Sequence, residues 1–172
     1  AILLISVGEL NRNKNHRVII QAMARLPQLP LYYILCGKGK EAEFLQELAQ
    51  SLHLSNRVRI LGYRQDVCDL LHASDIFCFP SKREGLGMAA LEAMEAGLPL
   101  VTSNIHGIRD YSLSGETGFA CPVSNVEEFA HAIETLSENR NLRKRMGTYN
   151  QQAVEAFYQA KTDEIMKSVY TD

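Results

Sequence analysis

Short apolar runs alternate with longer amphipathic stretches along the chain as far as Cys121. Each apolar run has the length of a β-strand and is followed by turn-forming residues or a polar loop. In the amphipathic stretches, apolar residues recur three or four positions apart, which is the spacing of one helix face. We predict strands at Ile2–Val7, Leu31–Cys36, Val58–Leu61, Ile76–Phe79, Leu98–Thr102 and Gly118–Cys121. We predict helices over Asn15–Leu26, Phe44–Leu52, Val67–Ala73, Met88–Ala96 and from Val126 onward.

This order of elements predicts a doubly wound α/β fold. Consecutive strands joined by a crossover helix run parallel, and a parallel sheet is covered by helices on both faces. The expected architecture is a Rossmann-like parallel sheet of about six strands with C-terminal helices. No repeat or low-complexity linker divides the sequence, so we predict one domain over residues 1–172. The chain opens directly on a strand with a buried pattern, as a sequence cut at a domain boundary does.

Composition excludes several classes of function. Lys and Arg number 18 and Asp and Glu 20, a net charge of −2 with the charges dispersed, which argues against nucleic acid as a partner. No apolar run approaches the roughly 18 residues of a membrane span, and the N-terminus lacks the features of a signal peptide. The four cysteines form no CxxC pair, so neither a zinc site nor a disulfide scaffold is expected. A reduced, cytoplasmic protein is the favoured interpretation.

The loop after the fourth predicted strand carries the candidate chemistry, because ligands of open α/β sheets bind at the carboxyl ends of strands. Gly85 and Gly87 remove side chains where a ligand could approach the backbone, and the helix that follows offers amides and a positive dipole end to an anion. Glu84 precedes this helix and Glu92 lies within it, about 12 Å further if the stretch is helical throughout. Carboxylates accept hydrogen bonds in pairs from the hydroxyls of sugars and riboses.

Two glutamates eight positions apart also occur on ordinary surface helices, so the spacing alone is weak. The full string resembles the E-x7-E signature of group 1 glycosyltransferases, which are retaining enzymes of family 4 with GT-B architecture. The segments in register with that signature are Glu84-Gly85-Leu86-Gly87, Glu92-Ala93-Met94 and Gly97-Leu98-Pro99-Leu100.

The resemblance extends over nearly the whole chain. Further segments similar to family motifs are Val7-Gly8-Glu9-Leu10, Lys14-Asn15-His16, Leu35-Cys36-Gly37-Lys38-Gly39, Leu61-Gly62-Tyr63, Leu70–Asp75 and Gly115–Phe119. In the family, a domain of this kind is the C-terminal half of a two-domain enzyme, one half of a GT-B fold. It binds the nucleotide sugar, while a preceding acceptor-binding half completes the site.

The resemblance implies a role for each matching residue. Glu84 is expected to be the catalytic residue and to contact hydroxyls of the donor sugar, while Glu92 would bind the ribose. Lys14 would neutralise the diphosphate and stabilise the leaving group. Amides of the glycine-rich loop would face the sugar and phosphates, and backbone near Gly37 and Gly62 would border the base. The donor-binding residues implied in this way are Lys14, Gly37, Tyr63, Arg64, Gly85, Leu86, Gly87, Met88 and Glu92.

Two positions depart from the family pattern. The family usually has an arginine where this chain has Glu9, and a carboxylate there cannot hold a diphosphate. Arg12 or Arg83 are candidates for the missing charge. The family segment G-G-x-x-E is replaced by His106-Gly107-Ile108-Arg109-Asp110, which leaves its role open.

Other ligand classes are not supported by the sequence. The segment Gly37-x-Gly39 lacks the third glycine of a dinucleotide-binding loop, and no P-loop is present. The five histidines show no paired metal spacing and no D-x-D occurs, so neither a metal nor another cofactor is expected.

We therefore predict the donor-binding half of a retaining hexosyltransferase that uses a nucleotide-diphosphate sugar in cell-surface or capsular polysaccharide synthesis. Its expected partners are the nucleotide sugar and the N-terminal acceptor domain, which is absent from this chain. Peripheral membrane contact through a full-length enzyme stays open. The alternatives are a nucleotide-sugar epimerase or hydrolase of the same architecture, and a binding module without catalysis.

Overall fold

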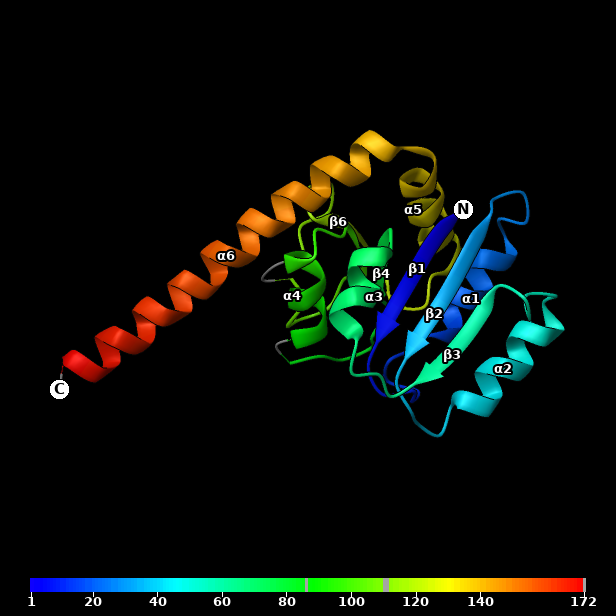
Figure 1. Ribbon diagram of the computed structural model, residues 1–172, viewed down its shortest axis with the longest axis horizontal. Helices are drawn as coiled ribbons and strands as arrows, with labels where there is room; N and C mark the ends of the chain where they lie inside the picture. Colours follow the sequence, from blue (N-terminus) through cyan, green and yellow to red (C-terminus); the bar gives the residue numbers. More distant parts are fainter. Residues whose placement is uncertain (86, 110–111, 172) are drawn as a thin grey trace.

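The computed structural model describes residues 1–85, 87–109 and 112–171 (Figure 1). Leu86 and Asp110, which the sequence analysis names, lie outside these residues. The described chain forms a parallel sheet in the order β3-β2-β1-β4-β5-β6. The strands are β1 (Ile2–Val7), β2 (Leu31–Cys36), β3 (Val58–Gly62), β4 (Ile76–Phe79), β5 (Leu100–Ser103) and β6 (Gly118–Cys121). This is the predicted doubly wound, Rossmann-like sheet.

Helices connect the strands and close the chain. They are α1 (Arg17–Ala24), α2 (Ala42–Ser51), α3 (Val67–Ala73), α4 (Met88–Glu95), α5 (Val126–Glu138) and α6 (Arg140–Tyr170). The side chains of Asn125 and Asn139 accept hydrogen bonds from the amides of Glu128 and Leu142, which caps α5 and α6. Among the described helices, none combines the length and apolar character needed to cross a bilayer.

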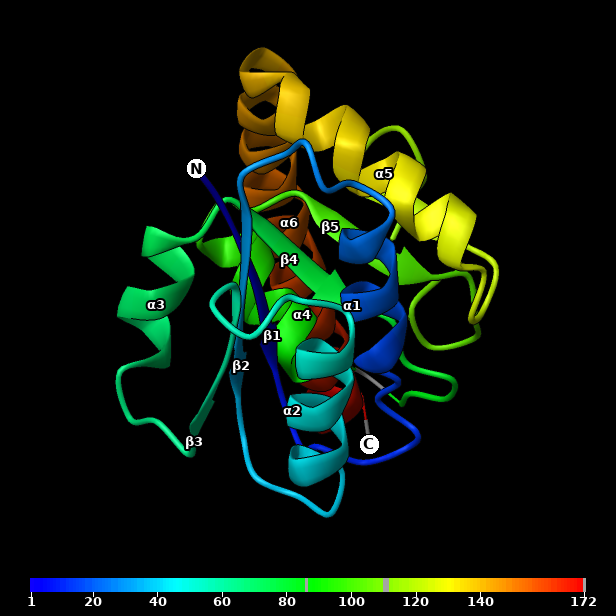
Figure 2. The same ribbon diagram turned by 90° about the vertical axis from the view of Figure 1, so that its right-hand side faces the viewer.

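Helices cover both faces of the sheet, as is usual for a parallel sheet. On one face, α1, α2 and α5 pack through Val18, Leu45 and Phe129. On the other, α3, α4 and the middle of α6 pack through residues that include Leu91 and Val154. Figure 2 shows α1, α2 and α5 on one side of the strands and α3 on the other. The near-continuous apolar character of the strands follows from this two-sided burial.

Helix α6 begins beside α5 and passes along the edge of the sheet to α4 (Figure 1). The buried side chain of Asn150 donates hydrogen bonds to the carbonyls of Leu98, at 2.8 Å, and Thr117, at 2.9 Å. Beyond this anchor the helix extends away from the sheet, and its last turns expose Ile165, Val169 and Tyr170.

The strand order places a topological switch point between β1 and β4. The chain leaves β1 for β2 and leaves β4 for β5, in opposite directions along the sheet. Loops that follow these two strands therefore diverge to opposite faces and leave a crevice at the carboxyl edge. The loop after β1 contains Lys14, and the loop after β4 contains Glu84 and Gly85.

Candidate functional site

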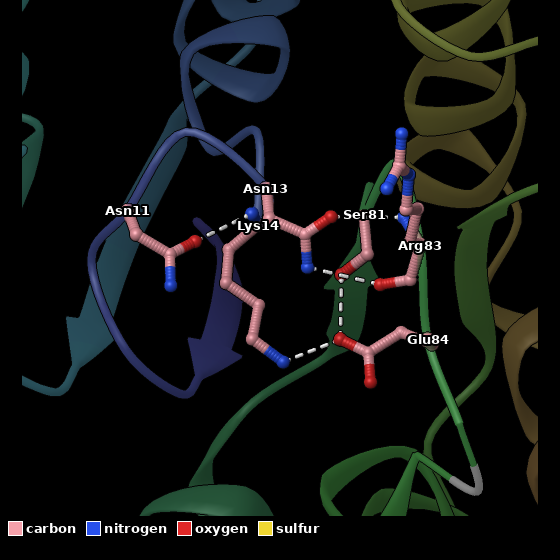
Figure 3. Close-up of polar contacts among 6 residues, drawn as sticks. All are labelled: Asn11, Asn13, Lys14, Ser81, Arg83 and Glu84. Carbon is pink, nitrogen blue, oxygen red and sulfur yellow. Dashed lines mark hydrogen bonds and ion pairs between the residues drawn. The ribbon is translucent and has the colours of Figure 1, made fainter.

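Asn13 joins the loop after β1 to the loop after β4. Its side-chain oxygen accepts a hydrogen bond from the Arg83 amide at 3.0 Å, and its side-chain nitrogen donates to the Arg83 carbonyl at 3.0 Å. Its carbonyl also accepts from the Lys82 amide at 2.8 Å. Figure 3 shows the two side-chain bonds between loops that are 70 residues apart in sequence. Three hydrogen bonds therefore hold the loop after β1 against the loop after β4. The sequence alone did not indicate this role of Asn13.

Lys14 and Glu84 form an ion pair inside this frame (Figure 3). The Lys14 amide donates to Oδ1 of Asn11 at 2.9 Å, and its Nζ lies 5.5 Å from the centroid of the Phe79 ring. The stem of Lys14 passes over Gly8, where a Cβ atom would lie 3.6 Å from Cε. The structure thus brings together two residues that the sequence analysis assigned to one site.

The Glu84 carboxylate is held through one of its two oxygens. Oε1 accepts from Lys14 Nζ and from the hydroxyl of Ser81, which lies 3.1 Å away. Figure 3 shows Oε2 pointing away from Lys14. Only 11% of the Glu84 side chain and 21% of the Lys14 side chain is exposed, so the pair is more shielded from water than surface ion pairs are. The shielded pair presents an oxygen acceptor and a cation to one crevice.

The glycine-rich loop follows Glu84 directly and leads into α4. Gly87 caps α4 with φ +70° in the left-handed region, which favours glycine, and no side chain caps the helix. A Cβ atom at Gly85 would meet no described atom within 4 Å. Neither a turn nor packing among the described residues therefore accounts for glycine at position 85. Met88, the first residue of α4, is exposed.

Glu92 lies one turn into α4 and is exposed. No polar contact between described residues joins it to Lys14 or Glu84. Burial and, to a smaller extent, the charges of Glu95 and Glu92 raise the pKa of Tyr158 on α6. The two glutamates of the signature therefore lie at different places around the start of α4.

The residues expected near the base differ in what they contact. A Cβ atom at Gly37 would lie 1.8 Å from the carbonyl oxygen of Gly8, so the missing side chain makes room for the loop after β1. Tyr63 is exposed. Arg64 donates two hydrogen bonds of 2.8 Å to Asp66, in front of α3. Sequence reasoning did not anticipate this Asp66 contact.

The two arginines considered as substitutes at Glu9 make polar contacts with other described residues. Arg12 pairs with Glu41 at 3.6 Å, and Arg17 reaches the same carboxylate at 3.5 Å. The Arg83 backbone is held by Asn13, and Arg83 is one of the residues that line a pocket beside Glu84. Glu9 is exposed. No described group of three or more His, Cys, Asp or Glu residues is arranged to hold a metal ion.

His16, two residues after Lys14, is buried at the start of α1, and its Nδ1 has no hydrogen-bond partner among the described residues. Burial, reinforced by the charge of Lys14, lowers the pKa of His16 to about 4. The unfolded chain, in which the pKa is about 6.5, then binds more protons below that pH. The free energy of unfolding should fall as pH decreases from about 6.5 to 4, with about 2 kcal/mol of the loss due to this residue.

Urea unfolding of the parent and of His16→Gln at pH 7 and pH 4.5 measures this contribution. We expect the difference in unfolding free energy between pH 7 and pH 4.5 to be about 2 kcal/mol smaller in the variant than in the parent. Equal pH dependence in both proteins would contradict the assignment to His16.

Comparisons with known proteins identify the family. The family model for group 1 glycosyl transferases matches residues 1–153. The chain belongs to this family. It is 35% identical over 146 residues to the lipopolysaccharide core biosynthesis glycosyltransferase LpsE of Rhizobium meliloti, a match that covers 85% of the chain and 42% of LpsE.

Solved glycosyltransferase structures share the fold. The crystal structure of HepE of Anabaena in complex with UDP aligns with a TM-score of 0.87 and 25% identity, over 97% of this chain and 49% of HepE. The crystallised C-terminal domain of the group 1 protein LpcC from Francisella tularensis aligns with a TM-score of 0.83 and 19% identity, over 91% of this chain and 86% of that domain. The chain therefore spans about half the length of LpsE and of HepE.

Proposed function

We propose that this chain is the C-terminal, donor-binding half of a retaining glycosyltransferase that uses a nucleotide-diphosphate sugar. The observation that carries the proposal is the shielded Lys14–Glu84 pair at the switch point between β1 and β4. Such a crevice is where open α/β sheets bind ligands, and a cation beside a carboxylate suits a ligand that has both phosphates and hydroxyls. Family membership and the UDP in the HepE structure support this ligand class.

The donor would exchange the contact between Lys14 and Glu84 for contacts of its own. Lys14 would bind the diphosphate and stabilise the negative charge that builds up on the leaving group as the glycosidic bond breaks. Glu84 would keep the Ser81 hydrogen bond at Oε1 and accept sugar hydroxyls through Oε2. Amides from Gly85 to Met88 would receive negative charge at the start of α4. No metal ion or other cofactor is part of this proposal.

Glu92 would bind the ribose hydroxyls in this arrangement. Glu92 is exposed and lies one turn beyond the start of α4, whereas Glu84 precedes this helix. The backbone around Gly62, Tyr63 and Arg64 would border the base, at the carboxyl end of β3. The nucleotide would then extend from Lys14 toward Glu92 on α4 and toward the carboxyl end of β3.

Transfer would require an acceptor-binding half. The chain covers 42% of LpsE and 49% of HepE, and the apolar residues Ile165, Val169 and Tyr170 on α6 are available to contact another domain. We propose that the complete enzyme transfers a hexose in cytoplasmic synthesis of a surface polysaccharide, with peripheral contact to a membrane. The name of LpsE supports the polysaccharide assignment.

Calorimetric titration with UDP, GDP and ADP and with the corresponding monophosphates tests the proposal. The best diphosphate should bind at least tenfold more tightly than its monophosphate, because only the diphosphate fully engages Lys14. The Lys14→Met variant should lose this preference, since a charge-assisted hydrogen bond contributes about 1.5–3 kcal/mol. Lys144→Met, an exposed change on α6, is the matched control and should behave like the parent. Equal affinity of the parent for diphosphates and monophosphates would contradict the role of Lys14.

A further inference from the structure

A pocket borders Glu84, and Lys14 is not among its lining residues. It has a volume of about 360 Å³ and is formed by the loops that follow β4 and β5. Its lining residues are Lys82, Arg83, Glu84, Asn104, Ile105, His106 and Arg109. A volume of this size is typical of sites for small molecules. Apart from Glu84, no lining residue of this pocket has a role in the donor binding proposed above.

Basic residues outnumber acidic ones in the lining of this pocket, although the whole chain has a net charge of −2. Three of its side chains carry a positive charge, and its single carboxylate, Glu84, already pairs with Lys14. Among the ion pairs between described residues, none involves Lys82, Arg83 or Arg109. The positive charge of these side chains is therefore available to a ligand.

The pocket is also held in a defined shape. Nε of Arg109 donates to Oδ1 of Asn104 at 2.9 Å, and Asn104 donates its own amide to the Cys121 carbonyl of β6 at 2.8 Å. These acceptors are neutral, so they orient the guanidinium without cancelling its charge. Gly107 packs so closely on the Glu84 loop that a Cβ atom would lie 2.3 Å from the Glu84 carbonyl oxygen. The guanidinium of Arg109 and the loop that carries Glu84 therefore have defined positions in the pocket.

We infer that this pocket binds an anionic group, a phosphate or a carboxylate, on the acceptor substrate. The inference rests on the proposed function, because it takes Glu84 as the residue that faces the donor sugar. Lys14 and the start of α4 serve the donor on the β1 side of Glu84, whereas this pocket opens on the β5 side. An acceptor anchored there through its negative group would have its nucleophilic hydroxyl beside the donor sugar. Alternatively, the anionic group in this pocket would be a carboxylate of the donor sugar itself.

The test uses the 172-residue chain and mannose 6-phosphate as probe, with mannose as the uncharged control. Each is titrated into the chain alone and into the chain saturated with the tightest-binding nucleoside diphosphate. We expect mannose 6-phosphate, but not mannose, to bind in both cases. Arg109→Gln and Lys82→Gln should each weaken the sugar phosphate at least fivefold and leave nucleoside diphosphate affinity unchanged. Arg140→Gln, an exposed change on α6, is the matched control.

Three outcomes would overturn the inference. Sugar phosphate binding that is insensitive to both variants would show that the pocket does not hold the anion. Displacement of the sugar phosphate by nucleoside diphosphate would place it in the donor site instead. A preference for UDP-glucuronate over UDP-glucose that both variants abolish would assign the pocket to a donor carboxylate. A different result would contradict the proposed function: the parent chain would not bind any nucleoside diphosphate.

Discussion

Alanine at Gly107 is expected to lower the free energy of unfolding by about 3 kcal/mol and to abolish measurable donor binding. The new Cβ atom would lie 2.3 Å from the Glu84 carbonyl oxygen and 2.4 Å from that of Gly85, and both are backbone atoms. Overpacking of this kind costs about 1–3 kcal/mol, and φ of +85° adds about 1–2 kcal/mol for a residue with a side chain. The backbone that carries Glu84 must then move. Urea unfolding and calorimetric titration with a nucleotide sugar measure the two effects.

Alanine at Gly85 is the matched control, because it changes the same loop without a clash. No described atom lies within 4 Å of the position that its Cβ would occupy. We expect the unfolding free energy of Gly85→Ala to stay within about 0.5 kcal/mol of the parent, as for other benign surface changes. Donor affinity should nevertheless fall at least tenfold, because the methyl group would occupy the space that the ligand needs. Normal stability in Gly107→Ala, or normal donor affinity in Gly85→Ala, would contradict this account.

The sequence was sufficient to predict the sheet because helices cover both of its faces and the strands are therefore mainly apolar, although β2 exposes Tyr32 and the edge strand β3 exposes Arg59. At the start of β5, the cap of the preceding helix explains why the observed bound differs from the predicted one. The strand predicted from Leu98 begins at Leu100, because the Leu98 amide still bonds to the Ala93 carbonyl of α4 and Pro99 has no amide hydrogen. The α4 terminus predicted from Gly97 is consistent with this cap, in which Gly97 has φ +80°.

The first helix was predicted too long for a similar reason. Apolar spacing alone predicted a helix over Asn15–Leu26, whereas α1 covers Arg17–Ala24. Asn15 has φ +60°, a left-handed conformation that asparagine tolerates better than most residues and that cannot continue a helix. Periodicity reports which side chains face the core, but it does not report where the backbone leaves the helical conformation.

The crevice was predictable only in part. The order of elements and the family signature were enough to place Lys14 and Glu84 at one edge of the sheet. The clamp from Asn13 to Arg83 and the Ser81 bond to Glu84 were missed, because their polar side chains show no periodicity and one pair is 70 residues apart. The close approach of Gly37 to Gly8 depends on how two strands diverge, which no local pattern encodes.

The two glutamates of the signature provide the second large expected effect. Glu92→Gln should weaken nucleoside diphosphate and nucleotide sugar alike, by about tenfold to a hundredfold, because the ribose is common to both and a charge-assisted hydrogen bond contributes about 1.5–3 kcal/mol. Glu84→Gln should weaken only the nucleotide sugar, because Glu84 would contact the sugar. Glu155→Gln, an exposed change on α6, serves as the control and should bind both ligands like the parent.

Calorimetric titration of Glu84→Gln and Glu92→Gln with UDP and UDP-glucose, or with the nucleotide pair that the parent prefers, therefore tests the donor site most directly. The account predicts that Glu84→Gln retains parental affinity for the free diphosphate and loses affinity for its sugar conjugate, whereas Glu92→Gln loses affinity for both. Equal losses in the two variants, or parental affinity for both ligands in both variants, would contradict it.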